Sequence, residues 1–260
     1  MTQYRSTMTE FYNIHTHSLI HPETEILSLS PEACPIPPSA IQASVGIHPW
    51  ELTEANASML WKRLQEQITD SRIVAIGECG LDKLKGPSLE LQTALFKQEA
   101  LLAEERSLPL IIHCVKAYNE LIQLKKEIRP NQPWIIHGFR GKEALATDCI
   151  RHGFYLSIGA HFQENTIKAI PLDRLFIETD ESKESIGSIY QRIAETQGIS
   201  LQKLTASINK NVREVFFKRY ELVVRRKCRI FALSSICHPE QREGSEYTHL
   251  RFSDSSLRSE

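Results

Sequence analysis

Short apolar runs recur along this chain, and they alternate with segments in which apolar residues return every three or four positions. Four runs are four to six residues long and are bounded by Pro, Gly or charged residues: 72–77, 109–112, 133–136 and 175–179. Runs of this length and composition are typical of strands buried on both faces of a parallel sheet. Four further runs predict strands of the same sheet: 11–14, 25–30, 42–47 and 153–159.

The segments between these runs have the spacing of amphipathic helices. The clearest covers 89–106, where Leu91, Leu95 and Leu102 recur at helical intervals after a Gly-Pro-Ser start. Helices are expected at 53–69, 89–106, 117–128, 141–151, 164–169, 184–197 and 200–218. Because strands and helices alternate, the pattern predicts an α/β protein, and eight strands predict a TIM-type (β/α)8 barrel.

The stretch between His17 and Ser44 departs from this alternation. It contains five prolines: Pro22, Pro31, Pro35, Pro37 and Pro38. Proline is excluded from helix interiors because it lacks the backbone N–H and clashes with the preceding turn. We therefore expect the first one or two crossover helices to be replaced by Pro-rich loops. One flank of the barrel would then be thinly covered, which suits either a homodimer interface or a trimmed monomer.

Residues that bind metal ions stand at the ends of the predicted strands. His15 and His17 follow the first run at positions i and i+2, so a strand would point both imidazoles to the same side. Single candidate ligands follow four later runs: Glu78, His113, His137 and Asp180. The carboxyl ends of barrel strands form one rim where the chemistry gathers, so these six side chains are expected to meet. Four imidazoles and two carboxylates exceed what one tetrahedral ion requires, which favours two divalent ions.

Composition narrows the classes of protein. The 260 residues are 41% hydrophobic and 24% charged, which is enough for one large core. The net charge of −1 excludes a generally basic nucleic-acid-binding surface, so a nucleic acid would have to be held locally. Six cysteines form no CxxC pair and no long apolar stretch is present, which predicts a reducing, cytoplasmic setting without a membrane span. Residues 9–220 are expected to form the barrel, and the serine-rich residues 221–260 a disordered C-terminal extension.

Seven motifs occur in a set order over residues 11–217: HTH (15–17), VGIHP (45–49), IGECGLD (76–82), LIIHC (110–114), IHGF (136–139), ETD (178–180) and NVREVF (211–216). In this order they resemble the TatD family of metal-dependent hydrolases, deoxyribonucleases with an amidohydrolase-like barrel. The resemblance implies a site for two divalent ions (Mg, Mn or Zn) with Glu78 as the bridge. His15, His17 and Asp180 would hold one ion, and His113 and His137 would hold the other.

The same resemblance implies how the reaction proceeds. Water bound to such an ion becomes hydroxide near neutral pH, because its pKa falls to about 7. Asp180 is expected to accept a proton from this water and pass it to the leaving oxygen, and Glu78 acts by bridging the ions. Glu178 is expected either to orient a ligand or to form a buried ion pair. Asp82 is expected either to orient a ligand or to stabilise a turn.

The substrate implied by the resemblance is DNA or a short nucleic acid, cut at its phosphodiester bonds. In the family the GxHP histidine, His48 here, lies near the substrate, although a turn-capping role stays open. Positive charge follows several strands, so Lys116 and Arg140 are predicted to contact phosphates, with solvated loop residues as the simpler alternative. Trp50 lies near this rim and is expected to pack against a helix rather than to stack on a base.

Two other functions stay open at this point. The same two-ion site can hydrolyse a carboxylic ester or an amide, as a deacylase does. The chain also departs from the family pattern in its loops, at Ser18, Val115-Lys116, Arg140 and Glu181. These departures leave room for a catalytically weak, metal-binding relative that serves as an interaction module.

Overall fold

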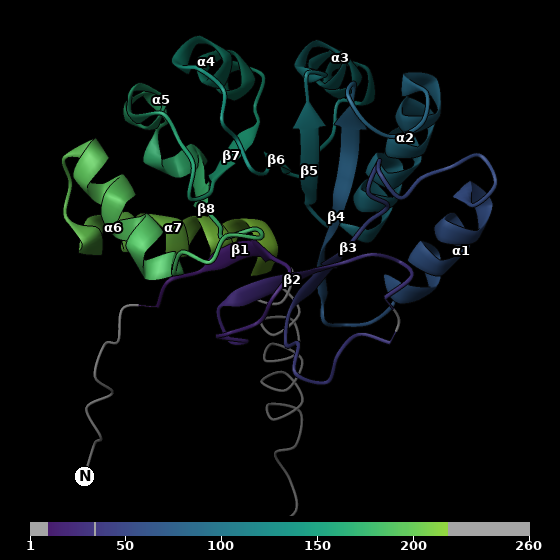
Figure 1. Cartoon of the computed structure of the whole chain (residues 1–260), viewed down its shortest axis with the longest axis horizontal. Helices are drawn as coiled ribbons and strands as arrows, with labels where there is room; N and C mark the ends of the chain where they lie inside the picture. Colours follow the sequence, from purple (N-terminus) through teal and green to yellow (C-terminus); the bar gives the residue numbers. More distant parts are fainter. Residues whose placement is uncertain (1–9, 34, 218–260) are drawn as a thin grey trace, which may run out of the picture. The chain divides into compact units, whose positions relative to one another are not determined.

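The computed structural model describes residues 10–33 and 35–217, and within them eight strands form one parallel sheet in chain order. The strands are β1 (Asn13–Thr16), β2 (Glu25–Leu29), β3 (Ala43–Val45), β4 (Ile73–Asp82), β5 (Leu110–Val115), β6 (Trp134–Ile136), β7 (Tyr155–Ile158) and β8 (Leu175–Ile177). Each strand is paired with the next, and β1 meets β8 at a parallel bridge between Thr16 and Asp180. The sheet therefore curls into a nearly closed barrel (Figure 1), which confirms the predicted fold class.

The seam between β8 and β1 is held largely by side chains. The Asn13 amide donates to Thr179 Oγ1 at 2.8 Å, and its Oδ1 accepts the Thr179 backbone N–H at 3.0 Å. The backbone N–H of Asp180 donates to the carbonyl of His15 at 3.0 Å. Because these bonds fix the last strand against the first, Asp180 lies beside the paired histidines that precede it by more than 160 positions.

The helices are α1 (Ala57–Gln67), α2 (Leu89–Arg106), α3 (Tyr118–Ile128), α4 (Glu143–Arg151), α5 (Glu164–Ala169), α6 (Ile186–Gln197) and α7 (Leu201–Val212), with a π-helical turn at Arg213–Phe217. They lie on the outer side of the strands (Figure 1). The links 17–24 and 30–42 contain no helix among their described residues, as their prolines predict. The first flank of the barrel is therefore covered by loops. Whether the protein is a monomer or a homodimer stays a prediction.

Strand β4 differs from its prediction. The apolar run was expected to end at Gly77, but the strand continues through Asp82, so Glu78 lies in its middle. The register with β5 shifts between Ile76 and Cys79. A Cβ on Gly77 would lie 2.4 Å from the Ile111 carbonyl oxygen, closer than real atoms approach. Gly77 is therefore required because β4 and β5 come together closely below Glu78, and it does not end the strand.

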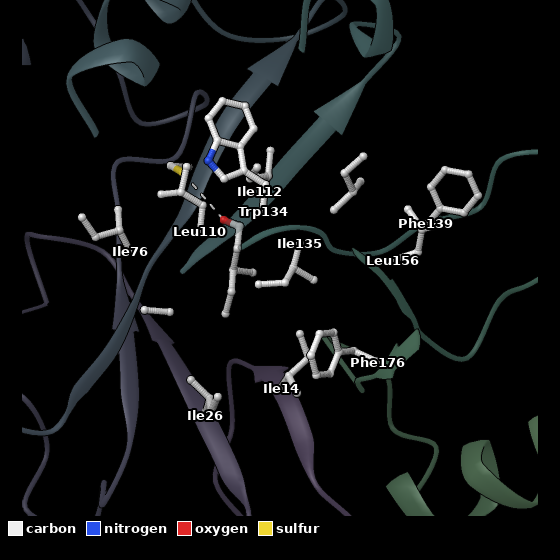
Figure 2. Close-up of a cluster of buried hydrophobic side chains, with 14 of the residues drawn as sticks. Ile14, Ile26, Ile76, Leu110, Ile112, Trp134, Ile135, Phe139, Leu156 and Phe176 are labelled. Atoms are coloured by element: carbon white, nitrogen blue, oxygen red, sulfur yellow. Dashed lines mark hydrogen bonds between the residues drawn. The ribbon is translucent and has the colours of Figure 1, made fainter. Parts of the chain in front are cut away.

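Buried apolar side chains of the strands form the core of the protein, and Figure 2 shows one cluster of them. Nearly every strand contributes to it, and the labelled residues that are at most 1% exposed include Ile14, Ile26, Ile76, Ile112, Ile135, Leu156 and Phe176. Truncating one such side chain to alanine typically costs about 2–5 kcal/mol. The barrel is thus a packed core that fixes the strand ends, and the polar side chains gather above it.

Two predictions fall on parts that the structure does not describe. The proposed boundary near residue 220 and the extension 221–260 lie outside the described residues. Within the described ranges, none of the helices has the length and apolar character needed to cross a bilayer. The cytoplasmic setting stays a prediction.

Candidate metal centre at the barrel mouth

The six predicted ligands converge on one cavity at the carboxyl ends of the strands. The cavity has a volume of about 970 Å³, and five of the six line it: His17, Glu78, His113, His137 and Asp180. The sixth, His15, is completely buried, and its Nε2 lies 3.3 Å from Glu78 Oε2. Glu78 stands at the centre because its two carboxylate oxygens face different groups of side chains. The six candidate ligands, which come from five separate segments of the sequence, therefore lie together at one end of the barrel, as expected from the sequence.

On the side of Glu78 Oε2, the donor atoms are spaced for a cation. His15 Nε2 lies 3.3 Å from this oxygen and 3.6 Å from Asp180 Oδ1. His17 Nε2 lies 3.7 Å and 3.5 Å from the same two atoms. A tetrahedral ion with bonds of about 2.0–2.1 Å separates its ligands by about 3.3–3.4 Å. These four residues fit a metal ion, and we call them the open side.

The burial of His15 supports that interpretation. Neither ring nitrogen of His15 has a hydrogen-bond partner among the described residues, although the side chain is 0% exposed. A buried polar atom without a partner costs about 1–3 kcal/mol. A cation between His15, Glu78 and Asp180 would satisfy Nε2 and remove this cost.

On the side of Glu78 Oε1, three imidazoles close around the oxygen. His137 Nε2, His113 Nδ1 and His48 Nε2 lie 2.8, 2.9 and 3.0 Å from it. We call these residues the closed side. Burial acts to raise the pKa of Glu78, but the charge of His137 and the hydrogen bonds from His113 and His137 outweigh it and hold this pKa well below its usual range. Glu78 is therefore an anion even though it is buried.

Asp180 and His137 are shifted by the same cluster. Burial acts to raise the pKa of Asp180, but the neighbouring His15 and His17 imidazoles lower it. Burial acts to lower the pKa of His137, but the carboxylates of Glu78 and Glu178 raise it well above its usual value. Cations are thus favoured next to these carboxylates, whether they are protons on imidazoles or metal ions, and the two compete.

Asp82 orients His113 from behind. Its Oδ2 lies 3.2 Å from His113 Nε2 and favours a ring proton there, which would leave the Nδ1 lone pair for a cation that replaces the hydrogen bond to Glu78. The indole N–H of Trp50 donates to the same oxygen at 2.7 Å, and Oδ1 accepts the Leu84 backbone N–H at 2.7 Å. The sequence left two roles open for Asp82, orienting a ligand or stabilising a turn, and its contacts in the structure are compatible with both.

Glu178 stands in the same relation to His137. Its Oε1 lies 3.4 Å from His137 Nδ1, which leaves Nε2 facing Glu78. The Gly138 backbone N–H donates to Oε1 at 2.6 Å, and the Ser157 hydroxyl donates to Oε2. A carboxylate behind a ligating histidine is the usual support of a metal site. Its position favours an orienting role for Glu178.

His48 lies in the cavity wall but is unsuited to hold a metal. Its Nδ1 accepts the backbone N–H of Trp50 at 3.0 Å. In the neutral ring this assigns the proton to Nε2, which points at Glu78 Oε1. A protonated nitrogen has no lone pair for a cation, so His48 is a hydrogen-bond donor, even though it clusters with Glu78 and His113.

Part of the cavity lining is basic. Lys116 and Arg140, both predicted from the sequence, line the cavity together with Lys142. Within the described part of the chain none of the three forms an ion pair, whereas Lys83 is paired with Glu120 at 2.6 Å. Lys142 was not among the residues predicted from the sequence. The signal was present, because Lys142 directly precedes helix α4 in the loop that follows His137.

The expectation for Trp50 was wrong. Its side chain is not buried against a helix. It is 48% exposed and lines the cavity. The sequence contained no signal for this direction, because the contact that turns the ring comes from Asp82, thirty-two positions away.

A nearly closed α/β barrel with a histidine–carboxylate centre at its carboxyl rim defines the class: the protein is a metal-dependent hydrolase. The chain belongs to the TatD-related DNase family, whose model matches residues 32–217.

Similar proteins agree with this assignment. An uncharacterized metal-dependent hydrolase of Bacillus subtilis, YabD, is 29% identical over 200 residues, which cover 68% of this chain and 77% of the relative. The 3'-5' ssDNA/RNA exonuclease TatD of Escherichia coli is 26% identical over 206 residues, covering 68% and 78%. Among solved structures, the TatD homologue YJJV of Escherichia coli matches with a TM-score of 0.62 at 19% identity, covering 74% of this chain and 85% of that one. A TatD family hydrolase of Entamoeba histolytica matches with a TM-score of 0.59 at 23% identity, covering 68% and 75%. At these identities the structural matches support the fold.

Proposed function

We propose that this protein is a nuclease that hydrolyses phosphodiester bonds of single-stranded nucleic acid with the help of two divalent ions. Several relatives are named 3'-5' ssDNA/RNA exonucleases. The observation that carries the proposal is the pairing of two features in one cavity. The histidine–carboxylate centre contributes five residues to the lining of this cavity, and Lys116, Arg140 and Lys142 line the same cavity.

The donor set supports two ions. His15, His17 and Asp180 would hold one on the open side, His113 and His137 the other on the closed side, and Glu78 would bridge them. A pair of ions held by a shared carboxylate would supply the chemistry that phosphodiester hydrolysis needs. Because most donors are imidazoles, we favour Zn²⁺ or Mn²⁺ over Mg²⁺. When bound, the ions would supply a hydroxide at neutral pH and stabilise negative charge on the phosphoryl group.

The side chains of this chain perform the remaining steps. Lys116 and Arg140 attract the substrate phosphates, and they add charge-assisted hydrogen bonds because no carboxylate in the described ranges neutralises them. His48 donates its Nε2 proton in a hydrogen bond to a phosphoryl oxygen, where negative charge develops. The Asp180 carboxylate accepts the proton of the attacking water and returns it to the leaving oxygen. Asp82 and Glu178 keep the imidazoles of His113 and His137 in the productive orientation.

The decisive experiment combines metal analysis with cleavage of a single-stranded oligonucleotide. We expect two ions per chain after metal loading, hydrolysis that a chelator stops, and recovery on adding Zn²⁺ or Mn²⁺. Unchanged cleavage in chelator would contradict the proposal.

A second measurement separates a nuclease from a deacylase. Lys116→Ala combined with Arg140→Ala should reduce oligonucleotide cleavage strongly while the bound metal stays constant. A protein that cleaves acylated amines or carboxylic esters with equal efficiency in this double variant would be a deacylase. If the metal-loaded protein turns over neither class of substrate, it is the metal-binding relative without strong catalysis.

A further inference from the structure

Trp50 is a large aromatic side chain that lines the cavity and has no role in the proposed chemistry. It follows His48 by two positions, is 48% exposed and lines the same cavity as Glu78, Lys116 and Arg140. Aromatic side chains of this size usually bury most of their surface. An indole that stays half exposed beside a reaction centre is therefore available to a ligand.

The ring is held in a defined position. Its N–H donates to Asp82 at 2.7 Å, and the backbone N–H of the same residue donates to His48 at 3.0 Å. The Lys85 ammonium lies 3.5 Å from the ring centroid and covers one face. The rings of His48 and His113 stand nearly perpendicular to it, at 77° and 76°. A ligand that meets this ring finds it already oriented, so little side-chain entropy is lost on binding.

The lining of the cavity combines two kinds of chemistry. Trp50 offers an aromatic surface, and Lys116, Arg140 and Lys142 offer positive charge. A nucleotide has the same two parts, a flat base and a charged phosphate. Proteins that bind single strands combine these features, with bases stacked on aromatic rings and the backbone against cations.

We propose that Trp50 determines specificity by stacking on the nucleobase next to the scissile phosphodiester, on the indole face opposite Lys85. This inference rests on the proposed nuclease function. A base inside a duplex is covered on both faces by its neighbours, whereas a base at an unpaired end is free to turn onto the indole beside the centre. Trp50 therefore favours single-stranded ends over paired ones.

The test compares two oligothymidylates in the metal-loaded protein. One is unmodified, and the other has an abasic residue at the end that is cleaved. Trp50→Ala should raise KM for the unmodified strand about 5- to 150-fold, which is the range of stacking contributions. On the abasic strand the wild type and the variant should have the same KM. An equal change on both strands would overturn the inference.

Trp50→Phe separates stacking from an effect through Asp82. Phenylalanine keeps an aromatic face but loses the N–H that donates to Asp82. If Trp50 is a platform, the phenylalanine variant keeps a KM within about threefold of the wild type and binds metal normally. If Trp50 acts only by positioning Asp82 and His113, both variants lose metal affinity and kcat together, and the inference is wrong. Leu101→Ala, an exposed apolar residue of helix α2, is the control for loss of an apolar surface side chain.

Binding without cleavage provides an independent readout. In chelator, oligothymidylate should quench the fluorescence of the wild type, and Trp50→Phe should abolish the quenching although Trp61 and Trp134 remain. If the wild type cleaves the unmodified strand but shows no quenching, stacking on Trp50 is refuted while the nuclease function stands. If the wild type cleaves no oligonucleotide at all, the proposed function itself has failed.

Discussion

The two sides of Glu78 are built from the same residue types but are closed to different degrees. On the open side the donor atoms stand 3.3–3.7 Å apart. On the closed side three imidazoles lie 2.8–3.0 Å from one carboxylate oxygen. An ion enters the open side without moving a ligand, whereas on the closed side it must displace hydrogen bonds to Glu78. We therefore expect the open side to bind the first ion more tightly, and a metal titration should show two steps.

Glu78→Gln tests what both sides share and should have the largest effect. The amide loses the charge that holds both groups of histidines, and removing one partner of a buried charge pair costs about 3–5 kcal/mol. We expect both steps of the titration to weaken by two orders of magnitude or more, with cleavage falling below detection. Isothermal titration calorimetry with Zn²⁺ measures this. If one step keeps its affinity, Glu78 does not bridge.

Asp180→Asn should affect the open side alone. Its carboxylate faces His15 and His17 but lies on the other side of Glu78 from His113. The tight step should disappear, one ion should remain per chain, and activity should fall about 10²–10⁴-fold because the proton acceptor is also lost. Asp173→Asn, an exposed aspartate, is the matched control. Loss of the weaker step instead would reverse the assignment of the two sides.

Asp82→Asn should affect the closed side alone, and more weakly. Asparagine keeps the shape but is a poorer acceptor for the His113 ring proton, and removing such a supporting group typically costs 10–100-fold in metal affinity. We expect the weaker step to lose about that much while the tighter step stays unchanged. Equal weakening of both steps would mean that Asp82 stabilises the whole rim and does not orient His113 in particular.

Some features of the candidate site could be predicted from the sequence, and others could not. The convergence of the six candidate ligands was predictable because a two-residue period in β1 and the common rim of barrel strands place them together. The position of Glu78 in the middle of strand β4 was not predictable. In the sequence Gly77 indicates the end of a strand, but in the structure it permits close contact with Ile111 on the next strand. The tautomer of His48 was also out of reach, since it depends on a loop N–H, and so was the direction of Trp50. The two-residue period of the strands and their order in the barrel determine which residues come together. Contacts between segments distant in sequence determine the orientation of their side chains.

The closed side has one further buried acid beneath it. Glu99 on helix α2 is 1% exposed, and its Oε1 accepts the backbone N–H of Ile47, the residue before His48, at 2.8 Å. Burial raises the pKa of Glu99 well above its usual 4.5, and the Ile47 hydrogen bond offsets this only in part. A raised pKa means that the folded protein binds this proton more tightly than the unfolded chain does. Its contribution to the free energy of unfolding is therefore complete below pH 4.5 and declines as the pH rises toward the folded-state pKa.

Glu99→Gln should remove that decline, with the smallest effect of the set. Glutamine keeps an acceptor for Ile47 but does not titrate, so the variant should melt at nearly the wild-type temperature at pH 5 and above it at pH 8. For a protein of this size each 1 kcal/mol corresponds to about 2–4 °C, and we expect a difference of that order. Thermal unfolding followed by circular dichroism at both pH values measures it, with Glu90→Gln, an exposed residue of the same helix, as the control. A difference in melting temperature that is the same at pH 5 and pH 8 would show that Glu99 is ionised in the folded protein and that its pKa is not raised. The closed side would then be held by packing, without a buried proton beneath it.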